Sequence, residues 1–376
     1  MASRKPTRQD RHVTRSPVLF VHAPGRGRAF VRRWSGQRSL FCCILAHTDT
    51  CLRPGISAAG IREDLRAFTP AADAEVVLTG LPRCLPALPS NPLGVPGPAA
   101  ITRAALRLAD IEACFVAAGL RVWPDVAVRR VACAPGGSVE TGRAVPEARE
   151  LFETGCCLGH ELAAERRHVV VGESVPGGTT TALALLLALG LRADGRVSGS
   201  MPGNAHRLKS RLARAGLAAS GLEPGDGRAD PLGAAACVGD PMQPLAAGIA
   251  AGASAAGAEV LLAGGSQMVA VAALLAALGG QAALERLAIG TTRWITADPA
   301  ADVAGLTAEL SPRLPLLAIN LDFCRSRHAA LQRYEQFLVK EGVGAGGACL
   351  AAVWSAAASI EDLQAAIDRA YADVLA

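Results

Sequence analysis

"VVVGESVPGGTTTALALLLALG" occupies residues 169–190. Three successive valines predict a buried strand, a proline and two glycines predict a turn, and the leucine-rich run predicts a helix. A strand that is apolar at nearly every position is typical of a parallel sheet covered on both faces. Hydrophobic packing explains neither Glu173 at the end of this strand nor the three threonines that open the helix, so the stretch also marks a candidate binding site.

The same alternation of strands and helices runs through the rest of the chain. Apolar runs predict strands at residues 40–50, 74–80, 112–120, 258–265 and 316–323, and helices are predicted at 101–111 and 146–165. The proline-rich residues 81–98 are expected to form an irregular surface loop. We therefore predict an α/β fold: a doubly wound, mainly parallel, Rossmann-like sheet with helices on both faces, plus a small, mostly helical accessory part.

The N-terminal segment differs from the remainder in charge. Residues 1–38 carry ten Arg or Lys against one acid, Asp10, which is +9 in a chain of net charge +5, so the remaining residues carry −4. A mildly acidic globular part gives no argument for nucleic-acid binding. We predict that residues 1–38 are a disordered extension or an over-long start, and that their removal leaves an active protein. Residues 39–376 are expected to form one α/β domain.

Composition argues against metal and membrane functions. Eleven cysteines are scattered without CxxC or Cys/His spacing, which indicates reduced thiols and no metal site. The apolar stretch at residues 248–280 is interrupted by Glu259 and Gln267, so no run of 18 apolar residues could span a membrane. We therefore expect a cytoplasmic protein that binds neither a metal nor a membrane.

The turn after the quoted strand is a candidate phosphate site. Gly177 and Gly178 precede a helix whose first residues include Thr179 and Thr180. Unpaired N–H groups and the positive end of the helix dipole suit an anion at this position. A P-loop would need a lysine after the glycines and a dinucleotide site would need GxGxxG spacing; both are missing. A helix that is simply capped by threonine and binds nothing remains an alternative.

Three other stretches offer related features. "KEGVGAGG" (340–347) places Glu341 beside glycines that let a ligand approach closely, and a carboxylate there could take a proton from that ligand; a charged helix end stopped by glycine is the alternative. The loop at residues 196–209 carries Ser198, Ser200 and Asn204, and "AGGSQ" (263–267) repeats the strand, glycine and hydroxyl pattern with Gly265 and Ser266. Two such turns at one sheet edge would form a crevice for a phosphorylated ligand.

Six motifs together resemble a known family. The series "GISAAG" (55–60), "TPAADAE" (69–75), "ESVPGGTTTA" (173–182), "SMPGNAH" (200–206), "GDPMQP" (239–244) and "KEGVGAGG" (340–347) is similar to archaeal and cyanobacterial relatives of nicotinate-nucleotide–dimethylbenzimidazole phosphoribosyltransferase. The resemblance covers about residues 40–370 in order. In the bacterial branch the turn reads more like GEMGIGNTT, and Gly178 stands where that pattern has asparagine.

The resemblance implies a reaction and assigns site residues. Nicotinate mononucleotide would donate ribose 5-phosphate to a ring nitrogen of dimethylbenzimidazole or a similar base, giving an α-ribotide for the cobamide lower ligand and free nicotinate, without a cofactor. Glu341 would be the general base. The phosphate and ribose would be bound by Glu173, Gly177, Gly178, Thr179, Thr180, Ser200, Asn204, Gly265 and Ser266. The base pocket would include Gly119, Leu120, Arg121, Gly342 and Gly344.

The resemblance to the family also implies a homodimer. Two other classes of function remain open at this point. A non-catalytic protein could capture a nucleotide or corrinoid precursor and deliver it to a partner, although such a binder has no use for Glu341 beside the base. A dinucleotide-dependent oxidoreductase is the other alternative, and the missing GxGxxG after the first strand argues against it.

Overall fold

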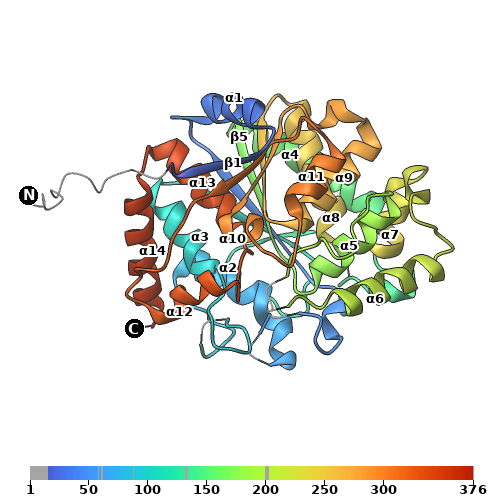
Figure 1. Ribbon diagram of the computed structural model, residues 1–376, viewed down its shortest axis with the longest axis horizontal. Coiled ribbons are helices and arrows are strands. Elements are labelled where there is room, and N and C mark those ends of the chain that lie inside the picture. The colour runs from blue at the N-terminus through green and yellow to red at the C-terminus, as the bar shows by residue number, and fades with distance from the viewer. Residues whose placement is uncertain are drawn as a thin grey trace, which may run out of the picture.

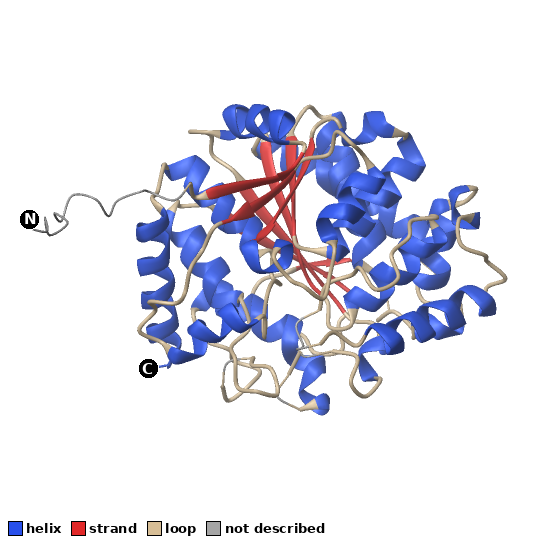
Figure 2. Ribbon diagram, viewed as in Figure 1, coloured by secondary structure: helices blue, strands red, loops and turns tan. Residues whose placement is uncertain are grey.

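One mixed sheet of eight strands organises the chain in this computed structural model, which describes residues 16–57, 59–60, 62–87, 89–131, 134–199 and 203–375 (Figures 1 and 2). The strand order is β1-β8-β7-β6-β5-β2-β3-β4. Every neighbouring pair is parallel except β1 with β8. The strands are β1 (Val18–His22), β2 (Leu40–Ala46), β3 (Glu112–Ala118), β4 (Arg129–Val131), β5 (His168–Ser174), β6 (Glu259–Ala263), β7 (Leu287–Thr292) and β8 (Leu316–Ile319).

Helices cover both faces of the sheet, as the apolar strands predict. In Figure 2 the strands run between two helical layers. The α-helices are α1 (Pro24–Trp34), α2 (Thr69–Thr79), α3 (Ala99–Leu108), α4 (Ala148–Glu165), α5 (Gly178–Ala188), α6 (His206–Ala219), α7 (Pro231–Val238), α8 (Met242–Ala255), α9 (Ser266–Gly279), α10 (Arg293–Thr296), α11 (Val303–Leu310), α12 (Ala329–Gln332), α13 (Ala345–Ala356) and α14 (Ile360–Leu375). Helices α6 and α7 pack on α5 and supply the expected helical accessory part.

The central strand β2 shows how the two layers arise. All seven of its residues are buried, and they alternate between two hydrophobic cores. Ile44 joins the core formed with α4, α5, α8 and α9, whereas Leu45 joins the core formed with α2, α3, α13 and α14. Because successive side chains of a strand point to opposite faces, a strand buried on both faces must be apolar throughout. The doubly wound fold predicted from the sequence is confirmed.

The chain reverses its direction of travel across the sheet between β2 and β5. Strands β3 and β4 lie on one side of β2, while β5, β6, β7 and β8 follow in order on the other. In such a sheet the connections leave the carboxyl ends of the two central strands in opposite directions, and a crevice forms between them. The first candidate position for a ligand is therefore the end of β5, at Glu173 and Ser174.

The apolar stretch at residues 248–280 lies inside the protein. It forms the end of α8, then β6 and α9, and α8 packs closely on α4 through paired glycines. A Cβ on Gly248 would lie 2.1 Å from the carbonyl oxygen of Phe152, so only glycine permits this approach of the two backbones. No helix within the described part of the chain has the length and apolar character to cross a membrane.

Residues 74–80 are helical, so the predicted strand there is wrong. They belong to α2, which has Pro70 in its first turn and ends at Gly80, whose φ of 98° is left-handed. Proline just inside a helix start and glycine just after its end are the usual helix boundaries, and this signal outweighs the two valines between them.

The predicted disordered extension is also wrong from residue 16 onward; residues 1–15 lie outside the described part. Strand β1 pairs antiparallel with β8, and α1 buries Phe30 and Trp34 against the sheet. The indole of Trp34 is fully buried and contacts the rings of Phe30, His168 and Trp354. Of the basic residues in this segment, Arg28, Arg32 and Arg33 lie on the exposed face of this amphipathic helix.

Candidate functional site

A cavity lies at the carboxyl end of β5, where the sheet reverses. It contains about 940 Å³ of space, part of it continuous with solvent. The residues that line it come from α2, the end of β5, the turn into α5, α6, α9 and the loops that include Ile56, Val95, Asn204 and Glu341. The sequence-predicted residues that line it are Glu173, Gly177, Gly178, Thr179, Asn204, Glu341 and Gly342.

The turn into α5 presents backbone donors to the cavity. Gly177 caps the helix at φ 82°, and a Cβ there would lie 3.0 Å from the backbone nitrogen of Cys51. The N–H of Gly178 and that of Thr180 are used within the turn, but across the described residues no hydrogen bond uses the Thr179 N–H. Thr180 points away from the cavity lining and keeps a buried hydroxyl without a partner. Glycine at 177 and 178 therefore leaves an open helix N-terminus that suits an anion.

Glu341 reaches the cavity from the loop before α13 and accepts four hydrogen bonds. Its Oε1 accepts the N–H groups of Gly342 and Gly346 at 3.2 and 3.1 Å. Its Oε2 accepts the N–H of Thr292 at 3.0 Å and the hydroxyl of Thr291 at 3.2 Å. Burial raises the pKa of Glu341 to about 7, and these donors oppose the rise. The carboxylate can therefore gain or lose a proton near neutral pH.

Glu173 is the second carboxylate of the cavity. It is nearly fully buried at the end of β5, and its Oε2 accepts a hydrogen bond from Gln267 Nε2 at 2.8 Å. Burial raises its pKa to about 8, with added repulsion from Asp240 and Glu341. Glu173 is therefore mostly protonated at neutral pH and can donate a hydrogen bond. Gln267 follows the AGGS motif, and no sequence pattern singled it out.

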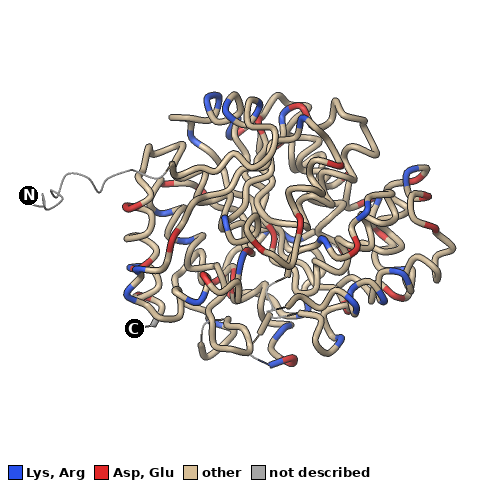
Figure 3. The backbone as a smooth tube through the Cα atoms, viewed as in Figure 1, with Lys and Arg blue, Asp and Glu red and all other residues tan. Residues whose placement is uncertain are grey.

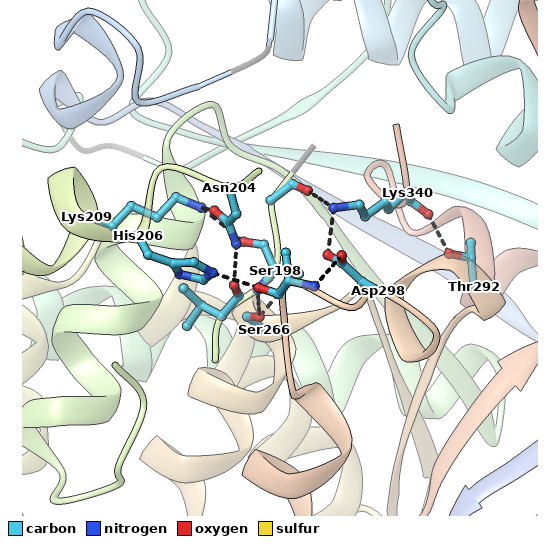
Figure 4. Close-up of polar contacts among 11 residues, drawn as sticks. Ser198, Asn204, His206, Lys209, Ser266, Thr292, Asp298 and Lys340 are labelled. Atoms are coloured by element: carbon cyan, nitrogen blue, oxygen red, sulfur yellow. Dashed lines mark hydrogen bonds and ion pairs between the residues drawn. The ribbon is translucent and has the colours of Figure 1, made fainter. Parts of the chain in front are cut away.

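Two buried lysines hold the loop that follows residue 196 (Figure 4). Lys209 Nζ donates to the carbonyl oxygen of Ser198 at 3.1 Å and to Asn204 Oδ1 at 2.6 Å. Lys340 Nζ donates to Gly199 O at 2.5 Å and pairs with Asp298 at 2.6 Å. Burial and the nearby Lys340 lower the pKa of Lys209 to about 7. Lys209 lies in the first turn of α6 and lines the cavity, so a titratable cation shares this space with the α5 turn.

The turn at Gly265 and Ser266 supports this loop and does not line the cavity. Ser266 Oγ accepts the N–H of Ser198 at 2.8 Å, and the two hydroxyls lie 3.1 Å apart. A Cβ on Gly265 would lie 3.1 Å from Ser198 Oγ. The two residues therefore shape the loop from below. Ser200 lies outside the described residues.

Residues Gly119, Leu120 and Arg121 do not line the cavity. Gly119 faces the carbonyl oxygen of Ala134, and Leu120 is buried in the hydrophobic core. Arg121 pairs with Asp49 on the surface, and its N–H donates to His47 Nδ1 at 3.1 Å. The structure thus gives no support to these three positions as a base pocket.

Gly344 also stands behind the lining, where its φ of 63° starts α13 and its Cα packs on Gly172. Apolar lining on this side comes instead from Val95, Pro98, Val339 and Val343, two of them from the segment expected to be a plain surface loop. The polar lining also includes Asp73, Gln267 and Lys209, and none of the three was predicted as a site residue. Residues this far apart in the chain give no local signal.

One group within the described ranges has the spacing of metal ligands. Asp322, Cys324 and Glu335 place their ligand atoms within 4.8 Å of one another. Arg293 forms ion pairs with both carboxylates, so part of the charge that would attract a cation is already compensated. None of these residues lines the cavity.

Basic and acidic residues are interspersed along the backbone in Figure 3, and no basic face stands out in that view.

Comparison with known proteins gives a family and a fold. No family model matches the chain. A UPF0284 protein of Gloeobacter violaceus is 46% identical over 357 residues, which cover 93% of this chain and 92% of the relative. A UPF0284 protein of Methanothermobacter thermautotrophicus is 43% identical over 318 residues, or 84% and 88% of the two chains. These cyanobacterial and archaeal relatives confirm the branch that the motifs indicated.

Two solved structures from Thermus thermophilus share the fold. The nicotinate-nucleotide–dimethylbenzimidazole phosphoribosyltransferase aligns over 93% of this chain and 91% of its own, with a TM-score of 0.59 and 19% identity. A structure of CobT aligns over 90% and 91%, with a TM-score of 0.60 and 20% identity.

Proposed function

This chain belongs to the UPF0284 family, and we propose that it transfers ribose 5-phosphate from nicotinate mononucleotide to a ring nitrogen of a benzimidazole-like base. The products are an α-ribotide, of the kind used as a cobamide lower ligand, and free nicotinate. The observation that carries the proposal is the meeting of three groups in one cavity: the α5 turn, Lys209 and Glu341. The α5 turn and Lys209 supply an anion site, and Glu341 supplies a carboxylate whose pKa is about 7. All three lie where the strand order of the sheet reverses.

The phosphate binds at the α5 turn. The Thr179 N–H is free to donate there, and a protonated Lys209 adds positive charge from the first turn of α6. Because the pKa of Lys209 is about 7, its attraction for phosphate weakens as pH rises above neutrality. An anion bound beside it would raise that pKa and keep the charge.

Glu341 takes the proton of the incoming base. As one nitrogen of the base attacks the anomeric carbon of the ribose, the glycosidic bond to nicotinate breaks and its electron pair returns to the pyridine nitrogen. The other nitrogen then loses its proton to Glu341. Of its four donors, the Thr291 hydroxyl is the one that can rotate away and free a lone pair for this proton. The backbone N–H groups stay in place and fix the carboxylate.

Glu173 positions the sugar. As a protonated acid it can donate to a ribose hydroxyl, while Gln267 holds it against α9. The pyridinium leaving group already carries positive charge, so the reaction needs neither a metal nor a cofactor. Holding donor and acceptor in line is the main service of the protein, and such alignment can remove up to roughly 7–11 kcal/mol of barrier in ideal cases.

The test is release of nicotinate. Purified protein is mixed with nicotinate mononucleotide and a panel of benzimidazoles and purines, and free nicotinate and the new ribotide are quantified by chromatography. Release that depends on both protein and acceptor supports the transferase. If the protein binds the mononucleotide tightly and releases no nicotinate with any acceptor, it is a carrier, which is the second candidate function. A carrier would have no use for the Glu341 carboxylate with its pKa of about 7.

The active form is proposed to be a homodimer. Light scattering of the purified chain should give twice the monomer mass, and a monomer mass that persists at micromolar concentration would refute this part.

A further inference from the structure

Asp73 is a third carboxylate in the cavity, and the reaction proposed above leaves it without a role. It lies on α2, is only 4% exposed and lines the same cavity as Glu341. Its Oδ2 accepts a hydrogen bond from Ser174 at 2.7 Å. Across the described residues no hydrogen bond reaches its Oδ1. Buried carboxylate oxygens are normally paired, so an open one facing a cavity indicates a donor on the ligand.

The position of Asp73 separates it from the phosphate end. Ser174 and Glu173 are consecutive on β5, so their side chains point to opposite faces of the sheet. Glu173 faces α9 through Gln267, on the side of α5 and Lys209. Ser174 faces α2, on the side where Gly172 contacts Gly344. Asp73 therefore belongs to the wall opposite the anion site.

The apolar lining of the cavity lies on the side of α2 and suits a flat ring. Val95, Pro98, Val339 and Val343 are lining residues, and the three valines belong to the same hydrophobic core as residues of α2. A Cβ on Gly342, beside Glu341, would lie 3.1 Å from the Pro98 ring, and Gly97 precedes Pro98 in the chain. A Cβ on Gly97 would lie 3.9 Å from Asp73 Oδ1, so glycine leaves this oxygen accessible. This apolar lining thus shares one cavity with Glu341 and with the open carboxylate oxygen of Asp73.

We propose that Asp73 is a specificity-determining residue that selects acceptor bases with an O–H or N–H donor on the ring edge away from the attacked nitrogen. The inference rests on the proposed transferase function and names the acceptor class within it. An acceptor with a hydroxyl or amino substituent there satisfies Oδ1. An acceptor with methyl groups there leaves that oxygen desolvated and unpaired.

Without a ligand, burial already destabilises the charged form of the Asp73 carboxyl group. Burial raises the pKa of Asp73 to about 7, and the hydrogen bond from Ser174 opposes this only in part. A donor on the ligand would add the second hydrogen bond that a buried carboxylate normally has. The alternative is that Asp73 only anchors the end of β5 through Ser174, and the variants below separate the two roles.

The experiment compares 5-hydroxybenzimidazole with 5-methylbenzimidazole, which differ by a hydroxyl in place of a methyl of similar size. With nicotinate mononucleotide saturating, nicotinate release gives kcat/KM for each acceptor. The native protein should favour the hydroxy compound by about 10- to 100-fold, since hydrogen bonds to charged groups are of that strength. Asp73→Leu should bring the ratio to one or below, and Asp73→Asn, which retains one acceptor oxygen, should fall between.

Ser174→Ala is the matched control, because it removes the partner of Oδ2 and leaves Oδ1 in place. It should keep the preference for the hydroxy compound; if it abolishes the preference as Asp73→Leu does, Asp73 is an anchor. A native ratio near one, with nicotinate released by both acceptors, overturns the inference and leaves the transferase standing. If neither acceptor nor any other base in the panel releases nicotinate, the transferase itself is refuted and the inference with it.

Discussion

Replacing Glu341 with glutamine keeps the size of the side chain and removes its ability to take a proton. The native carboxylate accepts hydrogen bonds from Thr291, Thr292, Gly342 and Gly346. Glutamine has one acceptor oxygen and an NH₂ group that only donates. At least two of the four donors therefore lose their acceptor, whichever way the amide is turned.

Two magnitudes follow from this geometry. If Glu341 is the general base that we propose, its loss should slow the chemical step by about 10²–10⁴-fold. The mispaired donors should lower the free energy of unfolding by about 1–3 kcal/mol for each backbone N–H left without an acceptor. The variant must therefore be shown to be folded by thermal unfolding before its rate is interpreted.

The assay is single-turnover release of nicotinate with nicotinate mononucleotide saturating. Because the pKa of Glu341 is about 7, the native rate should rise as the pH increases from 6 to 8, as the carboxylate loses its proton. The Glu341→Gln rate should be low and independent of pH over this range. Affinity for the mononucleotide should change little, since we propose that its phosphate binds at the α5 turn.

Glu173→Gln is the matched control. Its native pKa of about 8 keeps Glu173 mostly protonated at pH 7, so glutamine resembles the working state of the side chain. Its chemical step should slow by less than Glu341→Gln, with the main loss in nucleotide affinity or stability. A native single-turnover rate for folded Glu341→Gln, or a loss confined to Glu173→Gln, would refute the assignment of Glu341 as the base.

Further outcomes are expected from the rest of the structure. Trp34→Ala should destabilise the protein by about 3–5 kcal/mol, and deletion of residues 16–38 should prevent folding, as thermal unfolding would reveal; an unchanged melting temperature would contradict the packing of α1. Lys209→Met should lower the affinity for nicotinate mononucleotide by roughly tenfold or more and the affinity for nicotinate riboside far less, as measured by calorimetry. Equal losses of affinity would show that the phosphate binds elsewhere. Gly178→Asp should have the same selective effect through repulsion, although a Cβ there also displaces Gln267, 2.3 Å away, so riboside binding is its essential control. Activity should survive exhaustive treatment with EDTA, and loss restored by one divalent ion would contradict the metal-free reaction.

The sequence alone determined the parts of this protein that depend on neighbouring residues. The apolar run before Glu173 predicts a strand buried on both faces, and the glycines after it predict an open helix N-terminus, because hydrophobic period and turn chemistry act over a few residues. The same reasoning identified Glu341 beside its glycines. Even α1 carried a readable signal, since Gly27, Phe30 and Trp34 have helical spacing that the surrounding arginines obscured.

Only the tertiary structure decided which distant residues share the cavity. Asp73, Lys209 and Gln267 come from three different helices, and they meet because strand order and helix packing place those helices around the end of β5. For the same reason residues 119–121, predicted to form part of the base pocket, lie outside the cavity, and its apolar lining comes from the segments around Val95 and Val343. The protonation of the carboxylates was equally beyond the sequence, because a pKa near 7 for Glu341 depends on how much water the fold excludes.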